Sequence, residues 1–289
     1  MTKVETSTSR ATENGRSTAR NLTLPVAPPQ SEGSAAVWLR HSLIQCKRLL
    51  MVWTRDPATT IQSMVYPLLM LLMLRVVLGD SVERATGAPA VYGYVPMISL
   101  VAAMAGAIVS ALGFKNEKRS GLLSRFWTMP THRAAGLTGR LLAEVIRVFV
   151  TTLGVIAVGV CIGFRFWYGP LASVAMVALP VLFGLAFAVM VTALATVSDG
   201  IVLVTSISMF TTLLMFFNSG FVPTFAYPAW LRSTVENQPM STAVDAMKGL
   251  AYDGPIAEPL VKTLIWLVGI IVVFAYPAVR GYRRAAETA

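Results

Sequence analysis

The sequence predicts an all-α polytopic membrane protein with six transmembrane helices. Of its 289 residues 55% are hydrophobic and only 13% are charged, and the mean hydropathy is +0.64. Soluble domains carry roughly 25% charged residues. Six apolar stretches approach or exceed the roughly 20 residues that a helix needs to cross a bilayer, and the basic residues gather in alternate connecting segments.

The predicted spans are Ile61–Gly79, Tyr94–Gly113, Val145–Phe164, Leu171–Val197, Ile201–Phe217 and Thr263–Val279. Only the first and third contain a charged residue, Arg75 and Arg147 respectively. We expect Arg75 to reach outward, towards Asp80 and Glu83, and Arg147 to lie near the cytosolic end of its span, beside Glu144. The sequence therefore predicts no ionisable group at the membrane midplane, where an ion-coupled transporter would carry one.

The basic residues predict the orientation of the chain. Outside the spans, 17 Lys and Arg residues fall before the first span, between the second and third, and after the last, whereas 5 fall in the other connections. Basic loops stay on the cytosolic side of a membrane, so we expect a multi-pass protein of the plasma membrane with both termini in the cytosol. The same distribution explains the net charge of +10 without nucleic-acid binding.

The composition also divides the chain into regions. Residues 1–34 are rich in Ser, Thr, Ala and Pro with no sustained apolar run, which predicts a disordered cytosolic tail with no secretory signal. Residues 35–284 form the predicted membrane domain, and residues 285–289 a short cytosolic tail. Cys46 and Cys161, the only cysteines, both lie in apolar helical patterns, which excludes a disulfide scaffold.

The stretch Ala36–Trp53 has the pattern of an amphipathic helix before the first span. Apolar residues recur at spacings of three and four and end at Trp53, whereas Arg40, Lys47, Arg48 and Arg55 follow a neighbouring strip. Such a helix lies in the headgroup plane of a membrane. It serves either as an anchor alone or also as a brace for a cytosolic partner. We expect it to end at Arg55, because Pro57 disfavours helix at Asp56.

The cytosolic loop 114–135 is the most informative segment. Apolar residues such as Phe126 and Trp127 alternate there with Lys118, Arg119 and Arg125 in the pattern of a short amphipathic helix, and Pro130 ends it. This helix is either an interfacial element or a docking element that moves two spans together. Small residues at Ala102, Gly106 and Ser110 in the preceding span predict close helix packing, within the chain or between copies.

The outer segment 219–259 contains aromatic residues interrupted by prolines. Phe221 and Phe225 with Pro223 predict either a re-entrant segment or an aromatic belt at the membrane surface. Residues 236–252 have the pattern of a short amphipathic helix. A polar strip in and after the fifth span serves either helix packing or substrate contact. Its candidate residues are Thr205, Ser208, Thr212 and Asn218.

The sequence shows no catalytic or cofactor site. It has no G-x-x-x-x-G-K-[ST] loop for nucleotide phosphates, and the Gly-Lys dipeptide does not occur. The two histidines, His41 and His132, lack further ligands at zinc-binding spacing. We therefore expect no enzyme activity, metal or cofactor in this chain.

The loop motif resembles the signature of type-2 ABC-transporter permeases. The match lies in the region between the second and third spans of that family. It consists of Glu117, Gly121 four residues later, Pro130 beyond, and then Gly139-Arg140. Arg55-Asp56-Pro57 and the outer Asn237-Gln238-Pro239 match as well, and the chain after about residue 35 follows the family's order of elements. Within the family it is most similar to the daunorubicin/doxorubicin-resistance permeases. One departure is Phe126-Trp127, where many members have smaller aliphatic residues.

The resemblance implies a membrane subunit of an ATP-driven exporter for a drug or a cell-envelope lipid. ATP and Mg²⁺ would bind to a separate ATP-binding subunit, present in two copies, which would dock on a coupling helix containing Glu117, Gly121 and Pro130. Residues 36–53 would form the connecting helix, residues 219–259 the outer gate, and a second permease subunit, identical or paralogous, would complete the path. The alternatives are an ion-coupled secondary transporter and a membrane scaffold that transports nothing.

Overall fold

The computed structural model describes residues 34–122, 132, 134–197, 200–252 and 254–287, and within these ranges all regular structure is helical. The prediction of an all-α fold is confirmed for these residues. The predicted tail 1–34 lies outside them except for Ser34, whereas residues 285–287 of the predicted tail 285–289 continue the last helix. The elements are α1 (Ala35–Arg55), α2 (Pro57–Thr86), α3 (Val91–Arg119), α5 (Ala135–Cys161), α6 (Gly169–Val197), α7 (Gly200–Phe216), the 3₁₀ turn η1 (Thr224–Ala226), α8 (Ala229–Asn237), α9 (Pro239–Ala251) and α10 (Ala257–Glu287).

Five of the described helices are long and apolar enough to cross a membrane: α2, α3, α5, α6 and α10. The sixth predicted span corresponds to α7, which is apolar but has 17 residues, at the short end of the range for a spanning helix. The structure therefore confirms a polytopic membrane protein, and six spans remain a prediction.

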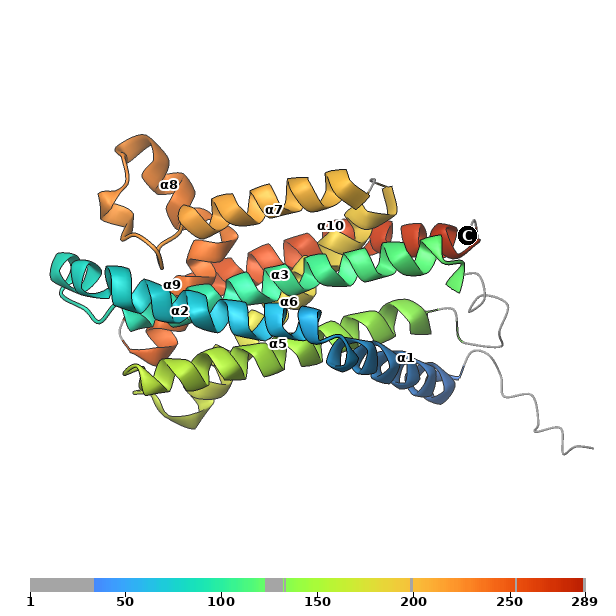
Figure 1. Ribbon diagram of the computed structural model, residues 1–289. Coiled ribbons are helices and arrows are strands. Elements are labelled where there is room, and N and C mark those ends of the chain that lie inside the picture. The colour runs from blue at the N-terminus through green and yellow to red at the C-terminus, as the bar shows by residue number, and fades with distance from the viewer. Residues whose placement is uncertain (1–33, 123–131, 133, 198–199, 253, 288–289) are drawn as a thin grey trace, which may run out of the picture.

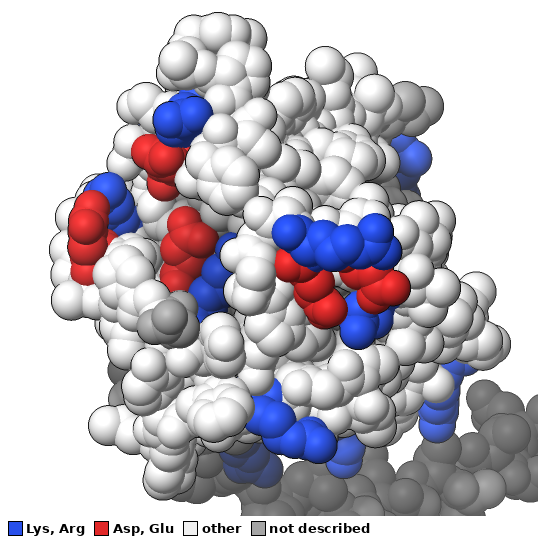
Figure 2. Space-filling view, turned by 90° about the vertical axis from the view of Figure 1, so that its left-hand side faces the viewer, with Lys and Arg blue, Asp and Glu red and all other residues white. Residues whose placement is uncertain are grey.

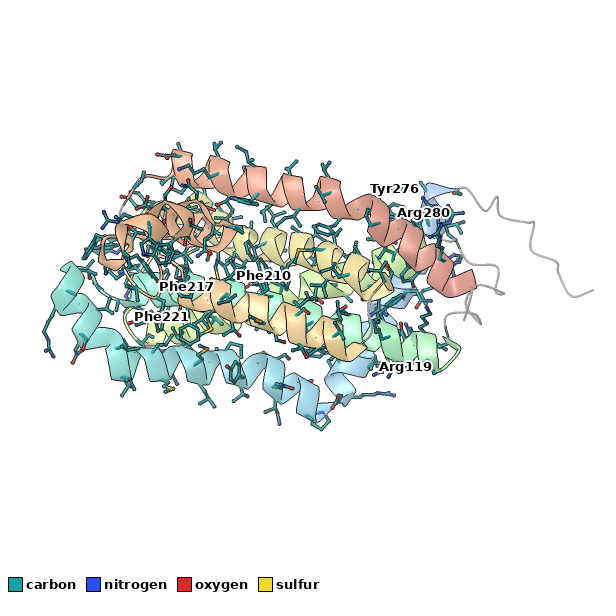
Figure 3. The ribbon with its side chains drawn as sticks, turned by 90° about the horizontal axis from the view of Figure 1, so that it is seen from above. Arg119, Phe210, Phe217, Phe221, Tyr276 and Arg280 are labelled. Atoms are coloured by element: carbon teal, nitrogen blue, oxygen red, sulfur yellow. The ribbon has the colours of Figure 1, made fainter. Side chains whose placement is uncertain are left out.

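Helix α3 occupies the centre of the bundle, as Figures 1 and 3 show. In the most apolar 18-residue stretch of α3, 72% is buried inside the bundle. The corresponding share is 17% in α2 and 11% in α10. Helices α5, α6, α7 and α9 pack against α3, and the side chains between them form one apolar core. Close packing around α3 is possible because small residues such as Ala103, Gly106 and Ala107 line it.

The bundle has two distinct ends (Figure 1). At the basic end, α3 ends, α5 begins and α10 reaches the C-terminal region, and this end also holds Arg119 and Arg280 (Figure 3). At the opposite, hairpin end, residues 87–90 join α2 to α3, and α8 and α9 lie nearby. Acidic and basic side chains lie beside each other at the hairpin end (Figure 2). Mixed charge here suits the orientation predicted from the sequence.

The break between α1 and α2 falls at the predicted position. Helix α1 ends at Arg55, Asp56 is extended, and Pro57 opens α2. The Asp56 carboxylate accepts a hydrogen bond of 3.2 Å from the Ala58 amide. Proline suits the first position of a helix because the amide hydrogen it lacks would have had no partner there.

Two helices differ from the sequence prediction. Helix α5 begins at Ala135, ten residues before the predicted span, because Ala135–Glu144 is helical although its polar residues lower the local hydropathy. The predicted helix 236–252 corresponds to α9, which begins three residues later because Pro239 opens it, and residues 236–237 are the end of the preceding helix α8. Helix α9 is also mostly buried rather than exposed along one face.

Candidate functional site

A charged cluster at the basic end joins three helices through one carboxylate. Glu117, in the last turn of α3, accepts a hydrogen bond of 2.6 Å from Arg48 of α1 through one oxygen and pairs with Arg140 of α5 through the other. The Glu117 and Arg140 side chains are only 13% and 4% exposed. Ion pairs this far from water are weakly screened. We call Arg48, Glu117 and Arg140 the charged clamp.

Arg140 is held from three sides. Its Nη1 donates to the Ser110 carbonyl oxygen at 2.6 Å, and its guanidinium lies 5.4 Å from the ring centroid of Phe114. The Phe114 ring in turn stacks on Tyr282 of α10 at 5.3 Å. The charged clamp is therefore in contact with the packing between α3 and α10. A displacement of Glu117 would shift contacts of four helices, α1, α3, α5 and α10.

Helix α1 packs directly against the first turns of α5. A side chain at Gly139 would place its Cβ 2.6 Å from the Gln45 Cβ and 2.8 Å from the Ser42 carbonyl oxygen, so only glycine fits this contact. The hydroxyls of Ser42 and Thr138 lie 2.6 Å apart. This contact keeps Arg48 within reach of Glu117.

The predicted connecting helix is present as α1, but its basic residues do not act alike. Arg48 turns into the charged clamp, whereas Arg40, Lys47 and Arg55 are exposed. Trp53 donates to the Ser63 hydroxyl at 3.1 Å and so ties α1 to α2. The sequence pattern placed all four basic residues on one strip. It could not predict that Arg48 pairs with Glu117, because the two residues are 69 positions apart in the sequence.

The predicted coupling segment begins later than expected. Residues 114–119 continue α3, with the cations Lys118 and Arg119 in its last turn, where they suit the helix dipole. Gly121 has a φ of 67°, a left-handed conformation that glycine adopts readily, just after the helix ends. Arg125, Phe126, Trp127 and Pro130 lie outside the described residues.

A second ion pair lies deeper in the bundle. Glu144 and Arg147 of α5 pair with each other, and Arg147 also donates to the Gly106 carbonyl oxygen of α3. The two residues are 2% and 8% exposed, and Arg147 is at the middle of α5. The sequence placed Arg147 near the start of the predicted span, and α5 begins ten residues before that span, so Arg147 lies at the middle of the helix, while its depth in the membrane stays a prediction. A buried charged pair therefore does exist near the middle of a spanning helix.

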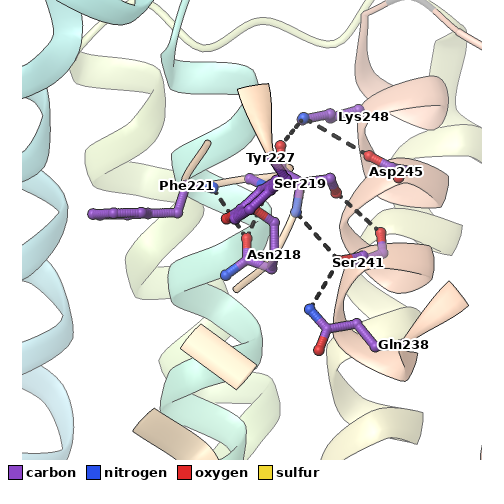
Figure 4. Close-up of polar contacts among 9 residues, drawn as sticks. Asn218, Ser219, Phe221, Tyr227, Gln238, Ser241, Asp245 and Lys248 are labelled. Carbon is purple, nitrogen blue, oxygen red and sulfur yellow. Dashed lines mark hydrogen bonds and ion pairs between the residues drawn. The ribbon is translucent and has the colours of Figure 1, made fainter. Parts of the chain in front are cut away.

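A polar network fixes the chain where α7 ends, at the hairpin end (Figure 4). The Asn218 side-chain oxygen accepts from the amides of Gly220 and Phe221 at 2.7 and 3.0 Å. The Ser219 amide donates to the Ser241 hydroxyl at 3.2 Å, and Lys248 donates to the Ser219 carbonyl oxygen at 2.7 Å. Asn218 is completely buried, so its side chain stabilises the turn.

These features occur in a chain that matches a known family of membrane proteins over most of its length. Residues 43–252 match the ABC-2 type transporter model. The chain belongs to the ABC-2 type transporter family. The matched range contains the charged clamp, the buried ion pair and the polar network. In ABC-2 transporters the permease subunit is the membrane component, and ATPase activity lies in a separate subunit.

Similar proteins carry names of drug-resistance permeases. The chain is 40% identical over 262 residues to the protein named "Probable doxorubicin resistance ABC transporter permease protein DrrC" in Mycobacterium tuberculosis strains CDC 1551 / Oshkosh and ATCC 25618 / H37Rv. That match covers 91% of this chain and 95% of the relative. It is 27% identical over 237 residues to "Daunorubicin resistance ABC transporter permease protein DrrB1" of Streptomyces coeruleorubidus, over 82% of this chain and 83% of the relative.

The remaining predicted residues of this ABC-2 chain lie on or after α7. Thr205 and Thr212 are exposed and Ser208 is partly exposed, all on the α7 face that also exposes Met209 and Phe210. Phe221 packs edge-on against Phe216, with ring centroids 5.4 Å apart. Phe225, in η1, is 62% exposed. The structure thus separates the exposed α7 face from the buried turn at Asn218.

Proposed function

We propose that this chain is the membrane-spanning permease subunit of an exporter driven by a separate ATP-binding subunit. The charged clamp is the observation that carries this proposal. It links the end of α3, which leads into the predicted docking loop, to α1 and α5. A subunit that moved the loop would therefore move three helices together, because the carboxylate of Glu117 is held from both sides.

In this proposal the basic end faces the cytosol and α7 is the sixth span. Two copies of the ATP-binding subunit bind ATP and Mg²⁺ and dock on the two loops of a pair of permease subunits, identical or paralogous. The connecting helix α1 lies in the headgroup plane, where the exposed Arg40, Lys47 and Arg55 meet anionic phosphates. The plasma membrane is the expected location.

The substrate is hydrophobic or amphipathic in this proposal. The α7 face that is exposed in the single chain combines apolar side chains with the hydroxyls of Thr205, Ser208 and Thr212, and it would line the path between two permease subunits. The names of the relatives agree with such a substrate, since doxorubicin and daunorubicin appear in them. The segment 219–259 would form the outer gate.

The test replaces the shared carboxylate of the clamp. Glu117→Gln removes the charge that joins Arg48 to Arg140, so ATP-dependent transport in vesicles that contain the chain and its co-purified ATP-binding subunit should fall about tenfold or more, a usual size for coupling between sites. Transport is expressed per folded, inserted protein. The control is Glu258→Gln, which changes an exposed carboxylate at the hairpin end.

Other outcomes would favour other functions. Unchanged ATP-dependent transport in Glu117→Gln contradicts the role of the clamp. Transport driven by an ion gradient without nucleotide would identify a secondary transporter, and the absence of both kinds of flux would identify a scaffold. A Walker-motif ATPase that co-purifies with the chain in mild detergent supports the proposed function.

A further inference from the structure

A cavity of about 240 Å³ lies at the hairpin end. It is partly open and is lined by the connection between α2 and α3, the segment that follows α7, and the last turns of α9. At about 30 Å³ for each water molecule, its volume corresponds to about eight waters. This is enough room for a small headgroup.

The walls of the cavity are mostly apolar. Val82, Ala88 and Pro89 line one side, and Phe221 and Pro223 line another. Tyr252 closes it from α9, and the ring of Tyr252 stacks on that of Tyr92 at 4.4 Å. Among the described residues that line the cavity, Lys248 is the charged one.

The Lys248 ammonium is incompletely paired. It donates to the Ser219 carbonyl oxygen at 2.7 Å, but its distance to the Asp245 carboxylate is 3.8 Å, beyond a hydrogen bond (Figure 4). An ammonium has three N–H donors, so donor capacity remains. The surrounding protein lowers the pKa of Lys248 by desolvation and raises that of Asp245 in the same way, and both side chains remain partly exposed.

We propose that this cavity binds an oxyanion carried on an apolar body, with Lys248 as the cation that recognises it. An anionic oxygen in the cavity would take the remaining ammonium donors, and the apolar walls would cover the rest of the molecule. Asp245 already compensates part of the lysine charge, so the site suits a singly charged group such as a phosphodiester. The inference does not depend on the proposed export, because binding can be measured on the chain alone.

The test measures binding to the full chain in an uncharged detergent. The probe is dioctanoyl phosphatidylglycerol, with bound molecules counted by native mass spectrometry, and dioctanoylglycerol, which has no phosphate, is the comparison ligand. Lys248→Met should weaken phosphatidylglycerol binding about tenfold or more, the usual effect of losing a charge-assisted hydrogen bond. Lys248→Arg should restore most of it. Lys262→Met is the control, since Lys262 pairs with Glu258 at 2.8 Å outside the cavity.

A second variant tests the cavity without changing its charge. Ala88→Phe places a ring where a headgroup would lie and should also weaken binding while thermal melting confirms the fold. Wild-type affinity in both Lys248→Met and Ala88→Phe would overturn the inference, as would equal binding of dioctanoylglycerol. Inorganic phosphate distinguishes the source of the oxyanion. If it displaces the lipid, the site accepts a free anion; if it does not, the site requires a lipid headgroup.

Discussion

Glu144 and Arg147 show how one ion pair constrains its neighbours. Both side chains are buried, and the guanidinium also reaches the Gly106 carbonyl oxygen of α3. A Cβ at Gly106 would lie 2.8 Å from both Arg147 Nη2 and Glu144 Oε1. The glycine therefore provides the space that the charged pair occupies between the two helices.

Removing one member of this pair should destabilise the fold more than removing both. Glu144→Leu or Arg147→Met alone leaves an uncompensated buried charge, which costs about 3–5 kcal/mol. The double variant replaces the pair by apolar side chains and should recover most of that loss. Thermal unfolding in detergent measures the three variants. Lys262→Met, in an exposed pair, should change the melting temperature little, and a double variant no more stable than the singles would contradict the prediction.

At the scale of elements, the contact between α1 and α5 depends on Gly139. The two helices are close enough for the Ser42 and Thr138 hydroxyls to meet, and the contact buries Cys46 of α1 to 3% exposure. Burial raises the pKa of the Cys46 thiol. At a given pH less of it is thiolate than in an exposed cysteine, so its reaction with maleimide should be slow at neutral pH and faster as the pH rises.

Gly139→Leu should release Cys46. In a Cys161→Ser background, the larger side chain pushes α1 away from α5, so maleimide should label Cys46 several times faster and at lower pH than in the parent. Gly154→Leu is the matched control, because Gly154 lies on the same helix with open space around its Cβ position. Equal labelling rates in the Gly139 and Gly154 variants would show that the α1 contact does not depend on Gly139.

At the scale of the whole molecule, the proposed orientation predicts opposite accessibility at the two ends. In a cysteine-free background, Ala85→Cys at the hairpin end should react with a membrane-impermeant maleimide in intact cells. Ser120→Cys, after α3 at the basic end, should react only once the cells are permeabilised. Both positions are exposed. The reverse pattern would place the basic end outside and contradict the orientation taken from the Lys and Arg distribution.

The sequence predicted local features of this bundle better than contacts between helices. Pro57 marked the break after α1, and the reach of Arg75 to Asp80 and Glu83 is confirmed at 3.4 Å for each pair. These features follow from neighbours within a few residues. The limits of α5 were misjudged because hydropathy locates the membrane core, whereas backbone hydrogen bonding continues the helix through polar residues.

The candidate sites required the tertiary structure. Glu117 was singled out from its motif, but its pairing with Arg48 and Arg140 spans 69 and 23 residues of sequence, and no periodicity reports a contact at that range. Asn218 was grouped with the polar strip of α7 because it follows at a suitable spacing. The structure instead turns it inward to bind backbone amides.

The buried unit of Gly106, Glu144 and Arg147 also has an evolutionary consequence. Loss of either charged residue leaves the other buried without its partner, and a larger residue at position 106 collides with both. A protein that changes these positions one at a time therefore passes through variants with lower fold stability. Homologous chains should therefore keep all three residues or have exchanged them as a set. An alignment in which the three positions vary independently would mean that other lineages separate these helices by different packing.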